Sequence, residues 1–82
     1  MKTHYPHMSF KIDPEAPLGP LWVAQDVETS RVFGGAIYDA ESGEEVFLPS
    51  APDAAYRIVD LEEIVEFLKE LEAERLPKGA TS

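Results

Sequence analysis

The segment from Val59 to Leu76 constrains the fold more than any other part of the sequence. Its apolar residues recur at steps of three and four, a spacing that places them on one side of an α-helix. These residues are Leu61, Ile64, Val65, Leu68 and Leu71. Asp60 is suited to cap the first turn, Glu63 to complete a capping box, and Pro77 to end the helix. The sequence therefore predicts a C-terminal helix whose apolar stripe packs on the rest of the chain.

Four shorter segments have the composition and period-two alternation of β-strands. They are residues 8–12, 21–28, 31–38 and 45–48. Residues 28–30 and 39–44 have turn chemistry, and Gly43 suits a positive φ. Gly34 and Gly35 lie inside the third segment, where they predict a bulge, a strong bend or a close approach. Residues 56–59 are either a last short strand or the lead into the helix.

These elements predict an α+β fold in which a three- or four-stranded antiparallel meander has the C-terminal helix packed on one face. Eighty-two residues make one domain, residues 1–82, near the lower limit for a single core. The expected flexible parts are residues 1–7, which have no periodicity, and residues 78–82. An apolar content of 44% argues against intrinsic disorder.

The chain has no cysteine and two histidines, so neither a disulfide nor a zinc site is expected, and we assign no cofactor. The motif Asp-x-Glu recurs at Asp13, Asp26 and Asp39, thirteen residues apart each time. Such carboxylate pairs could bind a divalent cation, or they could be the polar ends of successive strands. Successive turns of a meander lie at opposite ends of the sheet, which keeps the pairs apart. We therefore assign no metal.

Charge is the strongest compositional signal, because 16 Asp and Glu oppose 7 Lys and Arg to give a net charge of −9. Nucleic acids and anionic membranes repel so acidic a chain, so we expect it to bind neither directly. Basic protein surfaces attract it, including the nucleic-acid-binding faces of other proteins. The surplus acid could also serve solubility alone. Since no segment resembles a signal peptide or a membrane span, we expect a cytoplasmic protein.

The sequence offers little for catalysis, because a nucleophile needs a neighbouring base and that base needs a group to orient it. The histidines, His4 and His7, both lie in the expected loose N-terminus. Most of the serines occupy turn-like positions or the terminus, and Gly34-Gly35 lacks the lysine and following helix of a phosphate-binding loop. We therefore expect a protein that is not an enzyme.

Binding to another protein has support from the helix, where glutamates form a line. Glu62, Glu66 and Glu70 are spaced i, i+4 and i+8, with Glu63 beside them. Neighbours in this line rise about 6 Å along the axis, and like charges at that spacing repel. A row of carboxylates can mimic the phosphates that a nucleic-acid-binding protein recognises. The alternative is a solvated helix face without a partner.

A second candidate interface lies on the predicted sheet. One helix covers one face, and the other face would expose large side chains, among them Trp22, Phe33 and Phe47. Exposed aromatic patches of this kind mark interfaces with a different protein or with a second copy. The alternative is that the proline-rich segment, residues 13–20, and the termini fold over that face.

We therefore expect a small acidic, non-enzymatic protein that binds another protein stoichiometrically, as an inhibitor or neutraliser of a basic, nucleic-acid-binding partner. Its size and charge are similar in general character to those of phage anti-defence proteins, antitoxins and immunity proteins, without a shared motif. The expected partner-binding residues are Glu62, Glu63, Glu66, Glu70, Trp22, Phe33 and Phe47. The alternative is a homodimeric structural or accessory subunit that self-associates through the exposed sheet face.

Overall fold

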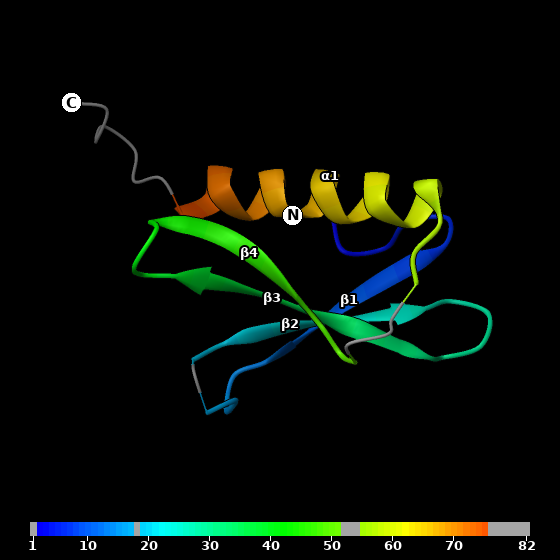
Figure 1. The fold of residues 1–82 in the computed structure, drawn as a ribbon, viewed down its shortest axis with the longest axis horizontal. Helices are drawn as coiled ribbons and strands as arrows, with labels where there is room; N and C mark the ends of the chain where they lie inside the picture. Colours follow the sequence, from blue (N-terminus) through cyan, green and yellow to red (C-terminus); the bar gives the residue numbers. More distant parts are fainter. Residues whose placement is uncertain (1, 18, 52–54, 76–82) are drawn as a thin grey trace.

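The computed structural model describes residues 2–17, 19–51 and 55–75, in which four strands precede one helix (Figure 1). The strands are β1 (Met8–Asp13), β2 (Leu21–Asp26), β3 (Val32–Asp39) and β4 (Glu44–Pro49). They form one antiparallel sheet in the order β1-β2-β3-β4. Helix α1 (Ile58–Arg75) crosses one face of the sheet. The predicted α+β meander with a C-terminal helix is thus confirmed, and residues 56–57 lead into the helix.

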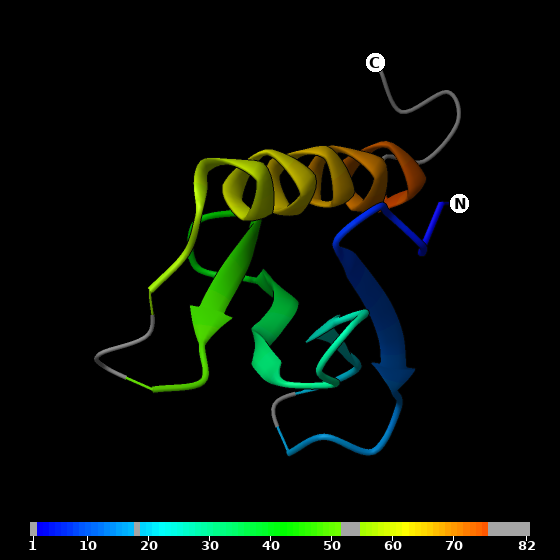
Figure 2. The same cartoon turned by 90° about the vertical axis from the view of Figure 1, so that its right-hand side faces the viewer.

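The sheet is curved, so its two edge strands, β1 and β4, lie below opposite sides of α1 (Figure 2). The pairing Phe10–Ala24 and the pairings Trp22–Ala36 and Ala36–Phe47 place these side chains on the face toward the helix. Within the described ranges, no helix is long and apolar enough to cross a membrane.

Each aspartate of the Asp-x-Glu repeat ends a strand and starts a turn. Asp13, Asp26 and Asp39 are the last residues of β1, β2 and β3. In each, Oδ1 accepts a hydrogen bond from the backbone N–H two residues on, at 3.1, 2.8 and 3.2 Å respectively. This is the Asx turn, in which a short carboxylate replaces a backbone acceptor. The thirteen-residue spacing therefore reflects one strand and one turn, and successive turns lie at opposite ends of the sheet.

The glycine pair in β3 allows both a bulge and a close approach, as its position in a strand predicts. The register slips between Ala24 and Gln25, because Ala24 pairs with Gly34 but Gln25 pairs with Val32. A Cβ atom on Gly34 would overlap the carbonyl oxygen of Leu48, and one on Gly35 would lie 2.6 Å from a methyl of Leu21. The slip leaves Phe33 as the extra residue of β3, and its side chain is buried in the core.

The core is an aromatic cluster centred on Phe67 of α1, which is completely buried. Its ring stacks on Phe10 with centroids 3.8 Å apart, and Trp22 and Tyr5 meet it edge-on at 5.4 and 6.4 Å. Edge-to-face aromatic pairs add about 0.5–1.5 kcal/mol beyond the area they bury. Tyr56, just before the helix, extends the cluster toward β3 and donates a 2.8 Å hydrogen bond to the carbonyl oxygen of Phe33.

The predicted apolar stripe of the helix is wrong in two of its five members. Leu61 and Val65 are 47% and 49% exposed, whereas Phe67, which the prediction left out, is buried. Ile64 and Leu71 are buried as expected, and Leu68 packs at the edge of the core. The helix is turned from the predicted orientation because Phe67 offers a larger apolar surface and three aromatic partners.

The helix also begins earlier than predicted, which changes the part that Asp60 plays. Since α1 starts at Ile58, Arg57 is the cap residue and its carbonyl accepts the first helical hydrogen bond from Leu61 at 3.0 Å. Asp60 lies in the first turn and accepts the Arg57 backbone N–H at 3.0 Å, the reciprocal half of a capping box. The predicted end of the helix at Pro77 lies outside the described residues, as does the expected flexible tail at residues 78–82.

The segment of residues 2–7 packs beside α1 and β1, which differs from the loose end that the sequence suggested. Tyr5 is 6% exposed, and backbone hydrogen bonds join Tyr5 to Met8 and Phe10 to Thr3. The ring of Tyr5 also meets Phe10 edge-on, with centroids 5.7 Å apart. A tight reversal of the chain at residues 6–7 brings this segment back along β1 (Figure 2). We refer to residues 2–7 as the amino-terminal segment.

Candidate functional site

The outer side of α1 carries an open groove with apolar and acidic walls. Ile58, Leu61 and Val65 recur at steps of three and four and are 75%, 47% and 49% exposed. They line a hollow of about 420 Å³ together with Glu62, Glu66 and Lys69. We refer to this hollow as the outer groove. Exposed aliphatic side chains gathered on one helix face, with charged residues beside them, form the kind of surface that a partner covers.

The four glutamates predicted to bind a partner are divided by the structure into two groups. Glu62 and Glu66 line the outer groove, and Glu70 lies half-buried one turn beyond Glu66. Glu63 is 9% exposed and faces the sheet side instead. Of the predicted line, Glu62 and Glu66 therefore border the groove and Glu70 does not, and Glu63, predicted beside the line, is turned toward the sheet.

Glu63 attaches the amino-terminal segment to the helix. One carboxylate oxygen accepts the backbone N–H of His7 at 3.2 Å, and the other lies 2.8 Å from His7 Nδ1. The sequence had suggested that Glu63 would reach back to Asp60 in a capping box. It instead bonds to a residue 56 positions earlier, because the chain reversal before β1 places His7 beside the first turns of α1. A buried carboxylate with two such partners is part of the architecture rather than of a free surface.

Lys2 brings a positive charge onto the acidic side of the helix. Its Nζ lies 3.3 Å from Glu66 and 4.4 Å from the centroid of the Tyr5 ring. Both side chains of the ion pair are about half exposed, at 51% and 55%. Tyr5 itself is held in a strongly acidic environment. Burial raises the pKa of its phenol to about 12, and the carboxylates of Glu66, Glu70 and Glu63 add to the rise.

The three aromatic residues predicted to form an exposed interface lie on the face that the helix covers. Trp22 contacts Phe67, Phe33 is 8% exposed, and Phe47 packs against Tyr56 with centroids 5.9 Å apart. The prediction that this face is uncovered is wrong. The physical reason is that α1 contributes the aromatic ring of Phe67, and this face of the sheet supplies Phe10 and Trp22 as its aromatic partners.

The opposite face of the sheet is aliphatic. Val23, Gly35 and Leu48 pair across the strands on this face, as do Ile37 and Val46. Ile37 is 9% exposed, whereas Leu48 and Val32 are 45% and 43% exposed. This face therefore presents partly exposed aliphatic groups beside the buried Ile37.

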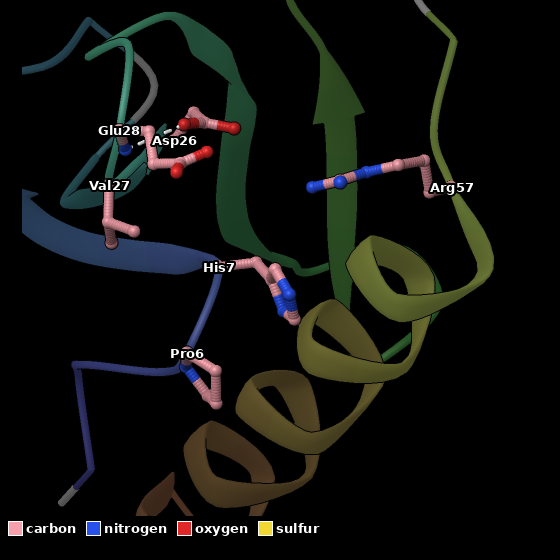
Figure 3. Close-up of a pocket in the computed structure, with 6 residues that line it drawn as sticks. All are labelled: Pro6, His7, Asp26, Val27, Glu28 and Arg57. Carbon is pink, nitrogen blue, oxygen red and sulfur yellow. Dashed lines mark hydrogen bonds between the residues drawn. The ribbon is translucent and has the colours of Figure 1, made fainter.

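A polar cavity of about 330 Å³ opens at the beginning of α1 (Figure 3). The Asp26 and Glu28 side chains extend into it from one wall and the Arg57 guanidinium from the other, with His7 near the helix. Backbone hydrogen bonds from Thr29 and Glu28 hold the pKa of Asp26 below its ordinary value. Pro6 and Val27 complete the lining.

Arg57 is already engaged from within the helix. Its Nε and a terminal nitrogen donate to the two oxygens of Asp60, both at 3.2 Å. Burial alone would raise the pKa of Asp60, but the Arg57 side-chain and backbone hydrogen bonds outweigh it and hold that pKa below its ordinary value. Asp26 thus stabilises the turn after β2, and Arg57 stabilises the start of the helix. Among the described residues, no group of three metal-ligating side chains gathers here or elsewhere.

Comparison of the chain with protein-family models, with curated proteins and with solved structures found no match.

Sequence reasoning missed the outer groove because it assigned Leu61 and Val65 to the buried stripe. A signal was present, since Ile58, Leu61 and Val65 repeat at helical spacing just as Ile64, Phe67 and Leu71 do. Two stripes on one helix cannot both face a single sheet. The aromatic residue marks the stripe that does, because the sheet supplies aromatic partners for it.

Proposed function

We propose that this chain is a cytoplasmic, non-enzymatic protein that binds a basic, nucleic-acid-binding protein stoichiometrically and inhibits or neutralises it, in the manner of antitoxins and immunity proteins. The observation that carries the proposal is the outer groove of α1, where exposed Ile58, Leu61 and Val65 adjoin Glu62 and Glu66. The occupant that fits this chemistry is a basic amphipathic helix of the partner. Its apolar residues would cover the aliphatic groups, and its lysines or arginines would meet the carboxylates.

The net charge of −9 supports the same partner class. A chain with this charge attracts a basic partner over distances of about 10 Å at 0.1 M ionic strength and accelerates the encounter. Neutralisation follows if the partner uses the same basic surface for nucleic acid, because the carboxylates then compete with phosphates for it.

A helical peptide with leucine at positions i, i+3 and i+7 and lysine on both sides is a suitable probe. We expect the protein to bind it in a one-to-one complex that weakens as salt rises, and to release it from a DNA duplex. Reversing Glu62 and Glu66 to lysine should weaken binding by at least about tenfold, since charge reversal at a contact costs more than a distant charge change.

The matched control reverses Glu15 and Glu41, which are exposed in the turns after β1 and β3 and change the net charge equally. Equal losses of affinity from the two double variants would contradict a specific site on α1. A scrambled peptide of the same composition tests whether the apolar row matters, and binding as tight as that of the amphipathic probe would contradict the groove.

Self-association is the second candidate function, favoured by the exposed Leu48 and Val32 on the aliphatic face of the sheet. The net charge opposes it, because two copies repel each other. The mass of the protein in solution, measured across the concentrations used for the peptide titration, distinguishes a dimer from the one-to-one complex.

A further inference from the structure

The amino-terminal segment places a lysine on the acidic rim of the outer groove, and this contact shows how that rim holds a cation. Lys2 Nζ has the carboxylate of Glu66 at 3.3 Å and the ring of Tyr5 at 4.4 Å. An ammonium group with an acid on one side and an aromatic face on another is held by charge and by the ring quadrupole together.

We propose that Glu66 and the Tyr5 ring form a subsite for one lysine or arginine side chain of a partner, and that Lys2 occupies this subsite until the partner displaces it. The inference rests on the proposed function for the identity of the partner, but the subsite itself is defined by residues of this chain. Glu66 connects the subsite with the outer groove, because it pairs with Lys2 and also lines the groove.

The parts of the subsite differ in how firmly they are fixed. Tyr5 is anchored, since it is buried and its ring meets Phe10 and Phe67 edge-on. The segment that carries it is fastened at His7 by Glu63 and at Thr3 by the backbone of Phe10. Lys2 lies beyond these attachments, and its side chain is 51% exposed.

The charge around the subsite favours a cation from outside as well as Lys2. The charges of Glu66, Glu70 and Glu63 all help to raise the pKa of the Tyr5 phenol, so the field at this position is negative. Lys2 supplies one positive charge in return, which leaves the surroundings negative. An exposed ion pair or an exposed cation–π contact each shifts an equilibrium by no more than about fivefold, so a partner can displace Lys2.

The substitution Lys2→Gln tests the proposal, with Lys11→Gln as the matched control. Lys11 is exposed on β1 and paired with Val23 on the sheet, so this control removes the same charge away from the helix. We expect Lys2→Gln to raise the affinity for the lysine-bearing helical peptide about fivefold, because the subsite is vacated in advance. We expect Lys11→Gln to change it less than about twofold. Equal effects of the two variants would contradict the proposal that Lys2 competes with the peptide for the subsite.

A second measurement tests cation binding at the subsite without the peptide. Ethylammonium chloride added to Lys2→Gln should shift the NMR signals of the Tyr5 ring toward their wild-type positions, whereas sodium chloride at the same ionic strength should not. Tyr5 signals that do not respond to ethylammonium in this variant would overturn the subsite. If ethylammonium restores the signals but no variant binds the peptide, the subsite stands and the proposed partner class fails.

Discussion

The two sides of α1 are nearly equal in aliphatic content but differ in what they meet. The inner side carries Ile64 and Leu71, and the outer side carries Ile58, Leu61 and Val65. Only the inner side adds an aromatic residue, Phe67, and the sheet face below it supplies Phe10 and Trp22 as partners. The comparison teaches that apolar periodicity identifies a helix but not the side that becomes buried. In this protein, the aromatic partners on the sheet decided which side of α1 is buried.

The acidic residues differ between the two sides in the same way. Inner Asp60 and Glu63 are 2% and 9% exposed, and each has a basic residue against it, Arg57 and His7 respectively. Outer Glu62 and Glu66 border the open groove. Acid on the inner side therefore holds the chain together, while acid on the outer side is exposed, with Glu66 paired to the half-exposed Lys2.

The largest expected effect on stability comes from replacing an isoleucine by alanine on the inner side of the helix, in comparison with the same replacement on the outer side. Ile64 is 4% exposed and Ile58 is 75% exposed, so Ile64→Ala and Ile58→Ala delete the same atoms from opposite environments. We expect Ile64→Ala to lower the free energy of unfolding by about 2–5 kcal/mol, through lost burial and the cavity that remains. Ile58→Ala should change it by no more than about 0.5 kcal/mol.

Chemical denaturation of the two variants measures this difference, with circular dichroism following the helix. Similar losses of stability would mean that α1 does not pack by one side, and the comparison between its sides would fail. Ile58→Ala should in addition weaken binding of the helical peptide, because it removes apolar surface from the outer groove.

A smaller effect is expected from the Tyr5 hydroxyl, which is buried and has no hydrogen-bond partner in the described part of the chain. The folded phenol has a pKa of about 12, against an ordinary value of 10.0. Between these pH values the native state binds more protons than the unfolded state, so stability falls as pH rises. The fall should total about 2–3 kcal/mol, and the stabilisation is fully present below pH 10.

The stability of the variant Tyr5→Phe should not decrease in this way between pH 10 and pH 12, because phenylalanine has no proton to release. Its stability near neutral pH should equal or exceed that of the wild type, since an unpartnered buried hydroxyl costs about 1–3 kcal/mol. Denaturation midpoints of both proteins between pH 8 and pH 12 test the prediction. Parallel pH profiles would show that Tyr5 ionises as an exposed tyrosine does.

The smallest expected effect on stability comes from removing the charge of an inner acidic residue, Asp60, in comparison with an outer one, Glu62. Asp60→Asn removes the charge that Arg57 pairs with, and we expect a loss of about 1 kcal/mol at neutral pH. The pKa of Asp60 is lowered in the folded protein, so its contribution is present above the ordinary value of 3.8. That contribution is lost as the pH falls below 3.8 through the folded pKa, and the two proteins should then converge.

Glu62→Gln is the control on the outer side, and it should change stability by less than about 0.5 kcal/mol. Thermal unfolding at neutral and at acidic pH measures both variants. Equal losses from Asp60→Asn and Glu62→Gln would contradict the division between structural and available acid.

The sequence by itself determined the strands, the turns and the presence of the helix, because these depend on neighbours along the chain. The turn residue Gly43 has φ 75°, as its place in the sequence predicts. The regularly spaced aspartates end three strands because a short carboxylate can accept a hydrogen bond from the backbone N–H two residues on. They are Asp13, Asp26 and Asp39. The net charge, and with it the proposed class of partner, also follows from sequence alone.

Only the tertiary structure decided which surfaces are free. The choice between the two stripes of α1 depended on Phe10 and Trp22, which lie more than forty residues before Phe67 in the sequence. The burial of Tyr5 and the attachment of His7 to Glu63 depended on a chain reversal before β1 that has no periodic signal. Local patterns record what a segment can form. Which of its sides is covered depends on distant side chains whose packing no local pattern contains.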